Sequence, residues 1–146
     1  MEYRKMDASD YEQCIALWRR TEGMGISSAD SREGIESYLE RNEGFSYVAV
    51  QSEDIAGTLL AGHDGRRGYL YHLAVKSEYR GQGIAKILVQ TCLDRLRDAG
   101  IERAHIMVMG SNESGQAFWT GLGWTRRGDI LLCSRDTHVN IAVGKE

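Results

Sequence analysis

Residues 69–99, YLYHLAVKSEYRGQGIAKILVQTCLDRLRDA, decide how this chain folds. The first seven, 69–75, are aromatic and apolar almost throughout, and they predict a strand. Residues 76–82 form a turn rich in glycine and basic side chains. A helix is expected from Gly83 to Ala99, with Gly100 as its C-cap. Its apolar side chains recur at helical spacing on one face: Ala85, Leu88, Val89, Cys92, Leu93, Leu96 and Ala99.

The junction between this turn and the helix has the character of a phosphate site. Gly81 and Gly83 permit positive φ and carry no side chain that would obstruct a ligand. Free backbone N–H groups and the helix dipole add partial positive charge there, and Arg80 and Lys86 add full charges. A tight structural turn is the alternative interpretation. The dinucleotide pattern G-x-G-x-x-G does not fit, because its sixth position is Lys86, and the pattern G-x-x-x-x-G-K-[ST] is absent.

Size and composition indicate a single globular domain, residues 1–146. The chain is 42% hydrophobic and 27% charged, which is ordinary for a soluble protein. A net charge of −3 argues against a general nucleic-acid binder. No apolar run approaches the roughly 18 residues of a membrane span. The first ten residues lack the apolar core of a secretion signal, so a cytoplasmic location is expected.

The three cysteines, Cys14, Cys92 and Cys133, are odd in number and far apart. This spacing argues against a disulfide framework and against a zinc site, and no metal is expected. Cys14 and Cys92 fall on apolar helix faces, where they are interpreted as small core residues.

The rest of the chain predicts a mixed α/β sheet with helices on both faces. Further strands are expected at 2–6, 45–51, 54–63, 102–109 and 124–134, and further helices at 8–21, 31–42 and 111–122. Asp7 and Ser31 are the expected caps of the first two helices. Short turns join the second, third and central strands as antiparallel hairpins, and strand 102–109 must run parallel to 69–75. With residues 135–146 taken either as a seventh strand or as a loose tail, the sheet has six to seven mostly antiparallel strands.

Two motifs resemble those of the GCN5-related N-acetyltransferase (GNAT) family. Arg80-x-x-Gly83-x-Ala85, after a strand ending in LAV, resembles motif A, which in the family binds the pyrophosphate of acetyl-CoA through backbone amides. Residues 112–124, NESGQAFWTGLGW, resemble the pattern N-x-x-A-x-x-[FL]-Y-x-x-x-G-F. The predicted element order from residue 2 to about 134 is also that of the GNAT fold. The chain is therefore identified as a member of the bacterial single-domain type.

The resemblance implies an acetyl-CoA-dependent N-acetyltransferase. An acetyl group would pass from acetyl-CoA to a primary amine of an unidentified small molecule, peptide or protein, by direct attack within a ternary complex. No Cys/His pair in the sequence suggests a covalent intermediate. The alternative is a catalytically weak acetyl-CoA or CoA sensor, or a partner-binding module, on the same scaffold. Homodimers are common in this fold, but this sequence does not show one.

The resemblance also implies where the cofactor binds. The strand before motif A would splay from its parallel neighbour and receive the pantetheine arm in the gap, and the turn would surround the pyrophosphate. Trp119 stands where the family often carries a tyrosine that protonates the leaving thiolate, and an indole is no practical acid. Trp119 could instead pack against the cofactor arm. The implied cofactor-binding residues are Leu73, Ala74, Val75, Arg80, Gly81, Gln82, Gly83, Ile84, Ala85, Lys86, Asn112, Phe118 and Trp119.

The catalytic candidates are Tyr71, His72 and Asn112, the last of which would reach the pantetheine or a water near the thioester. The identity of the proton acceptor stays open. It is one of several side chains or a base that acts through a water molecule, and the alternative interpretation is that these side chains are structural. Strand alternation places Tyr71 and His72 on opposite faces, so only one of them can face the acceptor. The side chains considered as the base are Tyr69, Tyr71, His72, His63 and Asp64. His105, like His72, is interpreted either as a base or as a structural residue.

Acceptor specificity is expected in loop 22–30 and in turn 63–68. Four acidic residues either attract a cationic amine or form a solvated helix face: Glu22, Asp30, Glu33 and Glu36. In the second segment, Asp64 with Arg66 and Arg67 forms either a rigid turn or part of a site.

Overall fold

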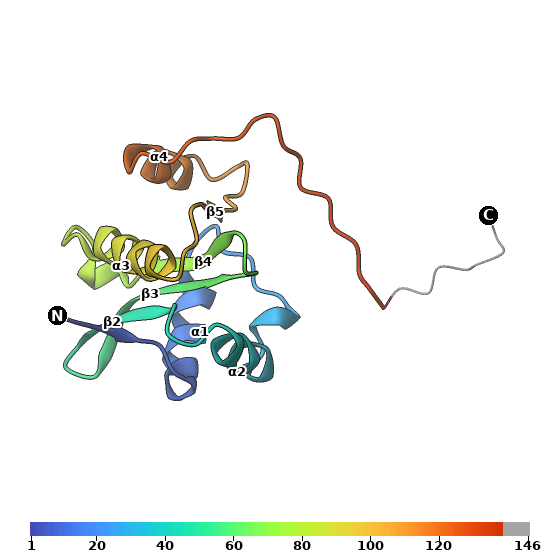
Figure 1. The fold of residues 1–146 in the computed structure, drawn as a ribbon. Coiled ribbons are helices and arrows are strands. Elements are labelled where there is room, and N and C mark those ends of the chain that lie inside the picture. Colours follow the sequence, from blue (N-terminus) through green and yellow to red (C-terminus); the bar gives the residue numbers. More distant parts are fainter. Residues whose placement is uncertain (139–146) are drawn as a thin grey trace. The chain divides into compact units, whose positions relative to one another are not determined.

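The computed structural model describes residues 1–138, in which one compact unit comprises Met1–Glu113 and a second begins at Ser114. The first unit holds one sheet with the strand order β1-β2-β3-β4-β5 (Figure 1). Strands β1 to β4 pair antiparallel with their sequence neighbours, and β5 pairs parallel to β4, as predicted. The strands are β1 (Glu2–Lys5), β2 (Tyr47–Gln51), β3 (Asp54–His63), β4 (Gly68–Val75) and β5 (Ala104–Ile106).

Helices cover both faces of this sheet, as the sequence predicts. Two adjacent residues of β3 identify the two faces. A Cβ built on Gly57 would lie 2.9 Å from Ile84 Cγ2 of the central helix, whereas Thr58 Oγ1 accepts a hydrogen bond from Trp18 Nε1 at 2.9 Å. The helices of this unit are α1 (Tyr11–Arg20), α2 (Arg32–Arg41) and α3 (Ile84–Asp98), with short 3-10 turns η1 (Ala8–Asp10), η2 (Ser28–Asp30) and η3 (Ser77–Tyr79).

The predicted helix ends and core residues are confirmed. Asp7 caps η1, and Ser31 Oγ accepts from Gly34 N at 3.0 Å to cap α2. Gly100 follows α3 with φ +85° and donates its N–H to Arg97 O at 2.9 Å. Cys14 and Cys92 are both fully buried. Local capping chemistry therefore sets these boundaries.

Strand β4 carries one extra residue opposite β3. Thr58 pairs with Ala74 and Leu60 with Tyr71, so two residues of β4, 72 and 73, lie opposite the single residue 59. His72 takes φ +55° at this bulge. The bulge reverses the alternation of side chains, so Tyr71 packs edge-on against Tyr38 of α2 while His72 also faces the α1 side. The prediction that Tyr71 and His72 lie on opposite faces is therefore wrong.

The C-terminal part differs from the prediction. Strand β5 is shorter than 102–109, and α4 (Glu113–Gly121) is shorter than 111–122. Residues 124–134 form no strand: residues 128–129 form a turn, and Ile130, Leu131 and Leu132 after it are exposed rather than packed on a sheet. The described residues thus form five strands rather than six or seven. Of the predicted final segment, residues 139–146 lie outside the described residues.

Candidate active site

The N-terminus of α3 is open to a ligand. Gly81 and Gly83 both have φ +80°, both are exposed, and a Cβ built on either would meet no atom within 4 Å. Gly83 is the N-cap and provides no side-chain cap, whereas η1, η2 and α2 are each capped by a side chain. The first N–H groups of a helix have no intrahelical partner. At α3 these donors and the positive end of the helix dipole are left for an anion.

A small polar cluster braces the turn before α3. Lys76 Nζ lies 2.7 Å from Asp54 Oδ1, and the Tyr79 hydroxyl donates to Asp54 Oδ2 at 3.0 Å. The hydrogen bond from Lys76 lowers the pKa of Asp54 and raises the pKa of Lys76. Arg80 Nε donates to Val75 O at 3.2 Å, which holds this side chain at the end of β4. Lys86 is exposed on the first turn of α3.

The outer edge of β4 is open where it approaches this turn. The parallel pairing with β5 covers Gly68, Tyr69 and Leu70 only. Strand β4 continues to Val75, so residues 71–75 have no strand partner on that edge within residues 1–138. An extended ligand can therefore approach the backbone of this strand and meet the α3 N-terminus at its end.

His72 belongs to a largely buried polar network behind this edge. Its Nε2 lies 2.7 Å from Asp30 Oδ1 of η2, and its ring centroid is 4.7 Å from that of Trp18. Its carbonyl accepts from Thr58 Oγ1 at 2.9 Å, and Thr58 in turn accepts from Trp18. The side chain of Asp30 is only 7% exposed. The expectation of a solvated helix face is therefore wrong for Asp30, although Glu22, Glu33 and Glu36 are exposed.

This pair of His72 and Asp30 is the feature that the sequence interpretation missed. One signal was available, because Ser27-x-x-Asp30 repeats the spacing of Asp7-x-x-Asp10, and both form capping boxes. A capping box turns the acidic side chain back toward the chain and away from solvent. The spacing could therefore indicate a buried carboxylate, but not the partner of that carboxylate.

The other base candidates have different surroundings. Burial raises the pKa of the Tyr71 phenol, which favours its protonated form. Tyr69 and His105 lie side by side with ring centroids 5.6 Å apart. Asp64 Oδ1 accepts from the backbone N–H groups of residues 66 and 67, each at 2.8 Å, and these bonds lower the pKa of Asp64. Turn 63–68 is thus held rigid by its own hydrogen bonds, and His63 Nδ1 accepts from Gly65 N in the same turn.

The three remaining predicted residues fall in different parts of the chain. Asn112 lies against loop 22–30, because a Cβ on Gly23 would be 3.1 Å from Asn112 Nδ2. Phe118 and Trp119 belong to the second unit, where the Trp119 ring lies 5.2 Å from that of Phe118 and 4.9 Å from that of Trp124. Trp119 is therefore part of an aromatic cluster within its own unit. A contact of Phe118 or Trp119 with a cofactor stays a prediction.

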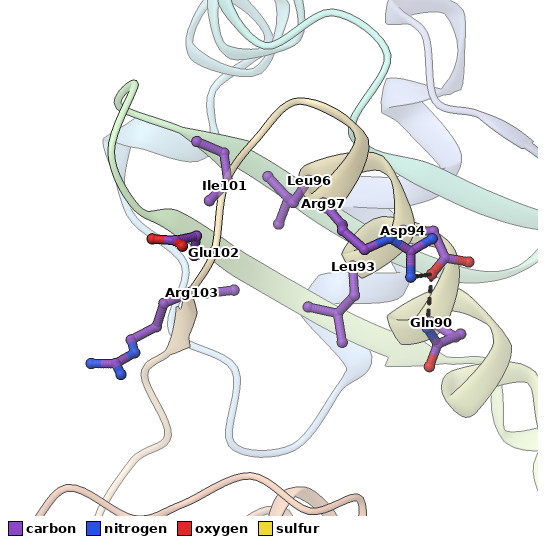
Figure 2. A pocket seen from close by; sticks show the side chains of 9 residues that line it. Gln90, Leu93, Asp94, Leu96, Arg97, Ile101, Glu102 and Arg103 are labelled. Atoms are coloured by element: carbon purple, nitrogen blue, oxygen red, sulfur yellow. Dashed lines mark hydrogen bonds and ion pairs between the residues drawn. The ribbon is translucent and has the colours of Figure 1, made fainter.

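A surface cavity of about 250 Å³ lies at the other end of α3 (Figure 2). It is lined by the C-terminal half of the helix and by the chain that leads into β5. Asp94, at its rim, accepts from Gln90 at 2.8 Å and pairs with Arg97 at 3.4 Å. Because these polar groups pair with one another and none belongs to residues 71–86, this cavity is separate from the candidate site.

Residues 1–138 contain neither a candidate membrane span nor a candidate metal cluster. No helix there combines the length and apolar character needed to cross a bilayer. No group of three or more His, Cys, Asp or Glu side chains is placed to hold a metal ion.

Comparisons with known proteins identify the family of this fold. The sequence profile of the Acetyltransferase (GNAT) family matches residues 11–124. An acetyltransferase of Sodalis glossinidius is 30% identical over 135 residues, which cover 92% of this chain and 94% of the relative.

Solved structures agree with the sequence comparison at the level of the fold. A predicted acetyltransferase from Clostridium acetobutylicum, solved with acetyl-CoA, superposes with a TM-score of 0.74 at 17% identity, over 91% of this chain and 95% of its own. An aminoglycoside acetyltransferase from an uncultured soil sample, solved with sisomicin, gives 0.72 at 18% identity, over 92% and 95%. The profile match over residues 11–124 and the 30% identical relative show that this chain belongs to the GNAT acetyltransferase family.

Proposed function

We propose that this protein is an N-acetyltransferase that uses acetyl-CoA to acetylate a primary amine by direct attack in a ternary complex. The observation that carries the proposal is the uncapped N-terminus of α3 at the end of the open edge of β4. An anion and an extended chain are the two parts that such a site accommodates, and a CoA thioester has both. The C. acetobutylicum structure solved with acetyl-CoA supports the choice of ligand.

The residues present fit this cosubstrate. The first-turn N–H groups of α3 and the exposed side chains of Arg80 and Lys86 would hold the pyrophosphate. The backbone of Leu73 and Val75, on the open edge, would hydrogen-bond the pantetheine arm. Bound acetyl-CoA supplies the thioester. The binding set proposed is Leu73, Ala74, Val75, Arg80, Gly81, Gln82, Gly83, Ile84, Ala85, Lys86 and Asn112, with Phe118 and Trp119 from the second unit.

The chain must then orient the amine and remove its proton. An alkyl amine with a reference pKa of about 10 is mostly protonated at pH 7, so a base is needed before attack. Tyr71 and His72 lie on one face of β4, and Asn112 lies against loop 22–30, which makes these three the proposed catalytic residues. Burial raises the pKa of Cys14 and Cys92 to about 12, which leaves both without nucleophilic thiolate at neutral pH.

The leaving thiolate does not require an acid from Trp119. A simple thiol has a reference pKa of about 8.5, so its thiolate departs more readily than an alkoxide would. The clustering of Trp119 with Phe118 and Trp124 supports a packing role for this indole. The proposal therefore keeps direct transfer while assigning no proton donor at position 119.

The test is calorimetric titration with acetyl-CoA and with free CoA, using two matched variants. Gly83→Asp should abolish measurable binding, because its carboxylate would cap the α3 donors and repel the pyrophosphate. Gly100→Asp is the control, since Gly100 has a similar φ of +85° and equally open surroundings at the other end of α3. We expect micromolar binding by wild type and by Gly100→Asp. Equal affinity of folded Gly83→Asp would show that the phosphates bind elsewhere.

The alternative function, a CoA sensor without turnover, is separated by a second assay. CoA release is followed with a panel of amines that includes spermidine, sisomicin, amino acids and a lysine peptide. The structure solved with sisomicin supports including an aminoglycoside. Turnover with any member supports the transferase, whereas tight binding without turnover across the panel would support the sensor.

A further inference from the structure

Two buried aspartates occupy equivalent positions in this fold. Asp10 ends η1 and Asp30 ends η2; each is 6% exposed, and each closes a capping box with the residue three positions earlier. Asp10 pairs with Arg4 at 2.9 Å, which is an ordinary structural ion pair at the edge of the sheet. Asp30 instead pairs with His72, on the strand edge where the acetyl donor is proposed to lie. The second carboxylate is therefore used differently from the first.

We propose that Asp30 is the positioning residue for His72, and that His72 accepts the proton of the acceptor amine. The inference rests on the proposed function, because it names the base for that reaction. It assigns to Asp30 an orienting role rather than contact with the substrate. Loop 22–30, which was expected to govern acceptor choice, would thereby be joined to the catalytic strand through one hydrogen bond of 2.7 Å.

The chemistry follows from the donor and acceptor capacity of the two groups. A carboxylate can only accept, so the hydrogen bond at Nε2 selects the tautomer that carries its proton there and leaves the lone pair on Nδ1. Nδ1 can then take one proton from the substrate ammonium, which leaves a neutral amine to attack the thioester carbonyl. As the C–N bond forms, the C–S bond breaks, and the departing CoA thiolate takes the second N–H proton of the amine to become the thiol. The resulting imidazolium lies beside the carboxylate of Asp30, which stabilises its charge. The proton leaves to solvent when the free enzyme is restored.

The backbone around His72 is held independently of this bond. His72 takes φ +55°, a region that non-glycine residues rarely adopt and in which histidine is among the enriched types. The carbonyl of His72 accepts from Thr58, and the imidazole packs against Trp18. Thr58 thus holds the backbone of His72, whereas Asp30 contacts His72 only at the imidazole nitrogen. Removing the charge of Asp30 should therefore change the imidazole more than the strand.

The experiment compares Asp30→Asn with the matched control Asp10→Asn, alongside His72→Gln and the double variant. Urea unfolding midpoints identify any loss of stability that the two aspartate variants share. Acetyl-CoA affinity is measured by calorimetry, and kcat is measured with the best amine of the panel above. Nitrogen-15 NMR of histidine-labelled protein reports the tautomer of His72 without any need for activity.

We expect wild type to show the Nε2–H tautomer and Asp30→Asn to lose it. A general base contributes about 10²- to 10⁴-fold, so kcat should fall at least about 10²-fold in His72→Gln and about 10-fold or more in Asp30→Asn. Acetyl-CoA affinity should change less than about twofold. Because Asp30 acts through His72, Asp30→Asn should have no further effect on kcat in the His72→Gln background.

Three results would overturn the inference. The first is wild-type kcat in folded Asp30→Asn, the second is an Nδ1–H tautomer in wild type, and the third is an equal loss of kcat in Asp10→Asn. Failure of the proposed function is recognised separately, because wild type would then bind no acetyl-CoA even though the tautomer of His72 could still be read.

Discussion

At the scale of single residues, the chain meets one physical need in two ways. Every helix begins with N–H groups that lack a partner. Ser31 satisfies them at α2 with its own hydroxyl, so that end of the helix is complete. Gly83 leaves them unsatisfied at α3, where a ligand can complete them. The N-cap side chain thus distinguishes the start of α2 from the start of α3.

The cluster around Asp54 should make stability depend on pH. The hydrogen bond from Lys76 lowers the folded pKa of Asp54 below its ordinary value of 3.8. The ionised carboxylate of Asp54 therefore stabilises the folded protein fully above about pH 5. This stabilisation is lost as the pH falls through the ordinary pKa of 3.8 and then through the lower folded pKa. Asp54→Asn should lose under about 1 kcal/mol at pH 7, because the cluster is partly exposed. Urea unfolding at pH 7, 5 and 3 measures this.

The control for that series is Glu53→Gln, which removes a neighbouring exposed carboxylate outside the cluster. It should unfold like wild type at each pH. If Asp54→Asn retains the full acid sensitivity of wild type, the cluster does not stabilise the turn before α3.

At the scale of elements, the bulge in β4 is held by a chain of hydrogen bonds that runs through β3 to α1 on one face of the sheet. Trp18 donates to Thr58, and Thr58 donates to the carbonyl of His72. Both Trp18 and Thr58 are fully buried, so no water can replace a lost partner. One hydroxyl thus connects a helix with the strand position that departs from regular geometry.

Thr58→Val should therefore be destabilising although it preserves the shape of the side chain. It leaves the Trp18 N–H and the His72 carbonyl without this partner, and we expect a loss of about 1–3 kcal/mol in the free energy of unfolding. Thr91→Val is the matched control, because the Thr91 hydroxyl only bonds back to Ile87 O of its own helix at 2.8 Å. Urea unfolding measures both. A loss below about 0.5 kcal/mol in Thr58→Val would show that the network does not stabilise the bulge.

At the scale of the whole molecule, the cysteines report on global unfolding. Cys14 lies on α1 and Cys92 on α3, on opposite faces of the sheet, and both are fully buried with a pKa raised by burial to about 12. Cys133 is exposed. Native protein should therefore titrate one thiol with a disulfide reagent such as DTNB, and all three only in denaturant. The variant Cys133→Ser should show no fast thiol, and a second fast-reacting thiol would contradict the packing described.

Apolar side chains that recur every two residues or every 3.6 residues were sufficient to predict most strands and helices of the first unit. Strand β3 has the predicted bounds, 54–63, and α3 was placed to within one residue at each end. Such regular elements are specified locally, by apolar spacing and by caps. The order of antiparallel hairpins and the parallel return of β5 also follow from the chain itself.

What the sequence could not provide depends on contacts between distant residues. At the bulge the carbonyl of residue 72 accepts from Thr58, which itself accepts from Trp18, and nothing adjacent to His72 in the sequence indicates these partners. Asp30 and His72 meet across 42 residues. The predicted strand at 124–134 is wrong because an apolar pattern forms a strand only against a partner strand, and here Ile130, Leu131 and Leu132 are exposed.

The bulge also acts on strand β4 as a frameshift acts on a coding sequence. Before residue 72 the odd-numbered side chains face α1 and α2, and after it the even-numbered ones do, as Tyr71 and Ala74 show. A deletion of one residue here would remove the bulge and leave every later position on its present face, because Ala74 would still lie opposite Thr58. An alignment of relatives that places the one-residue gap away from residue 72 would therefore compare side chains of opposite faces between the gap and the bulge.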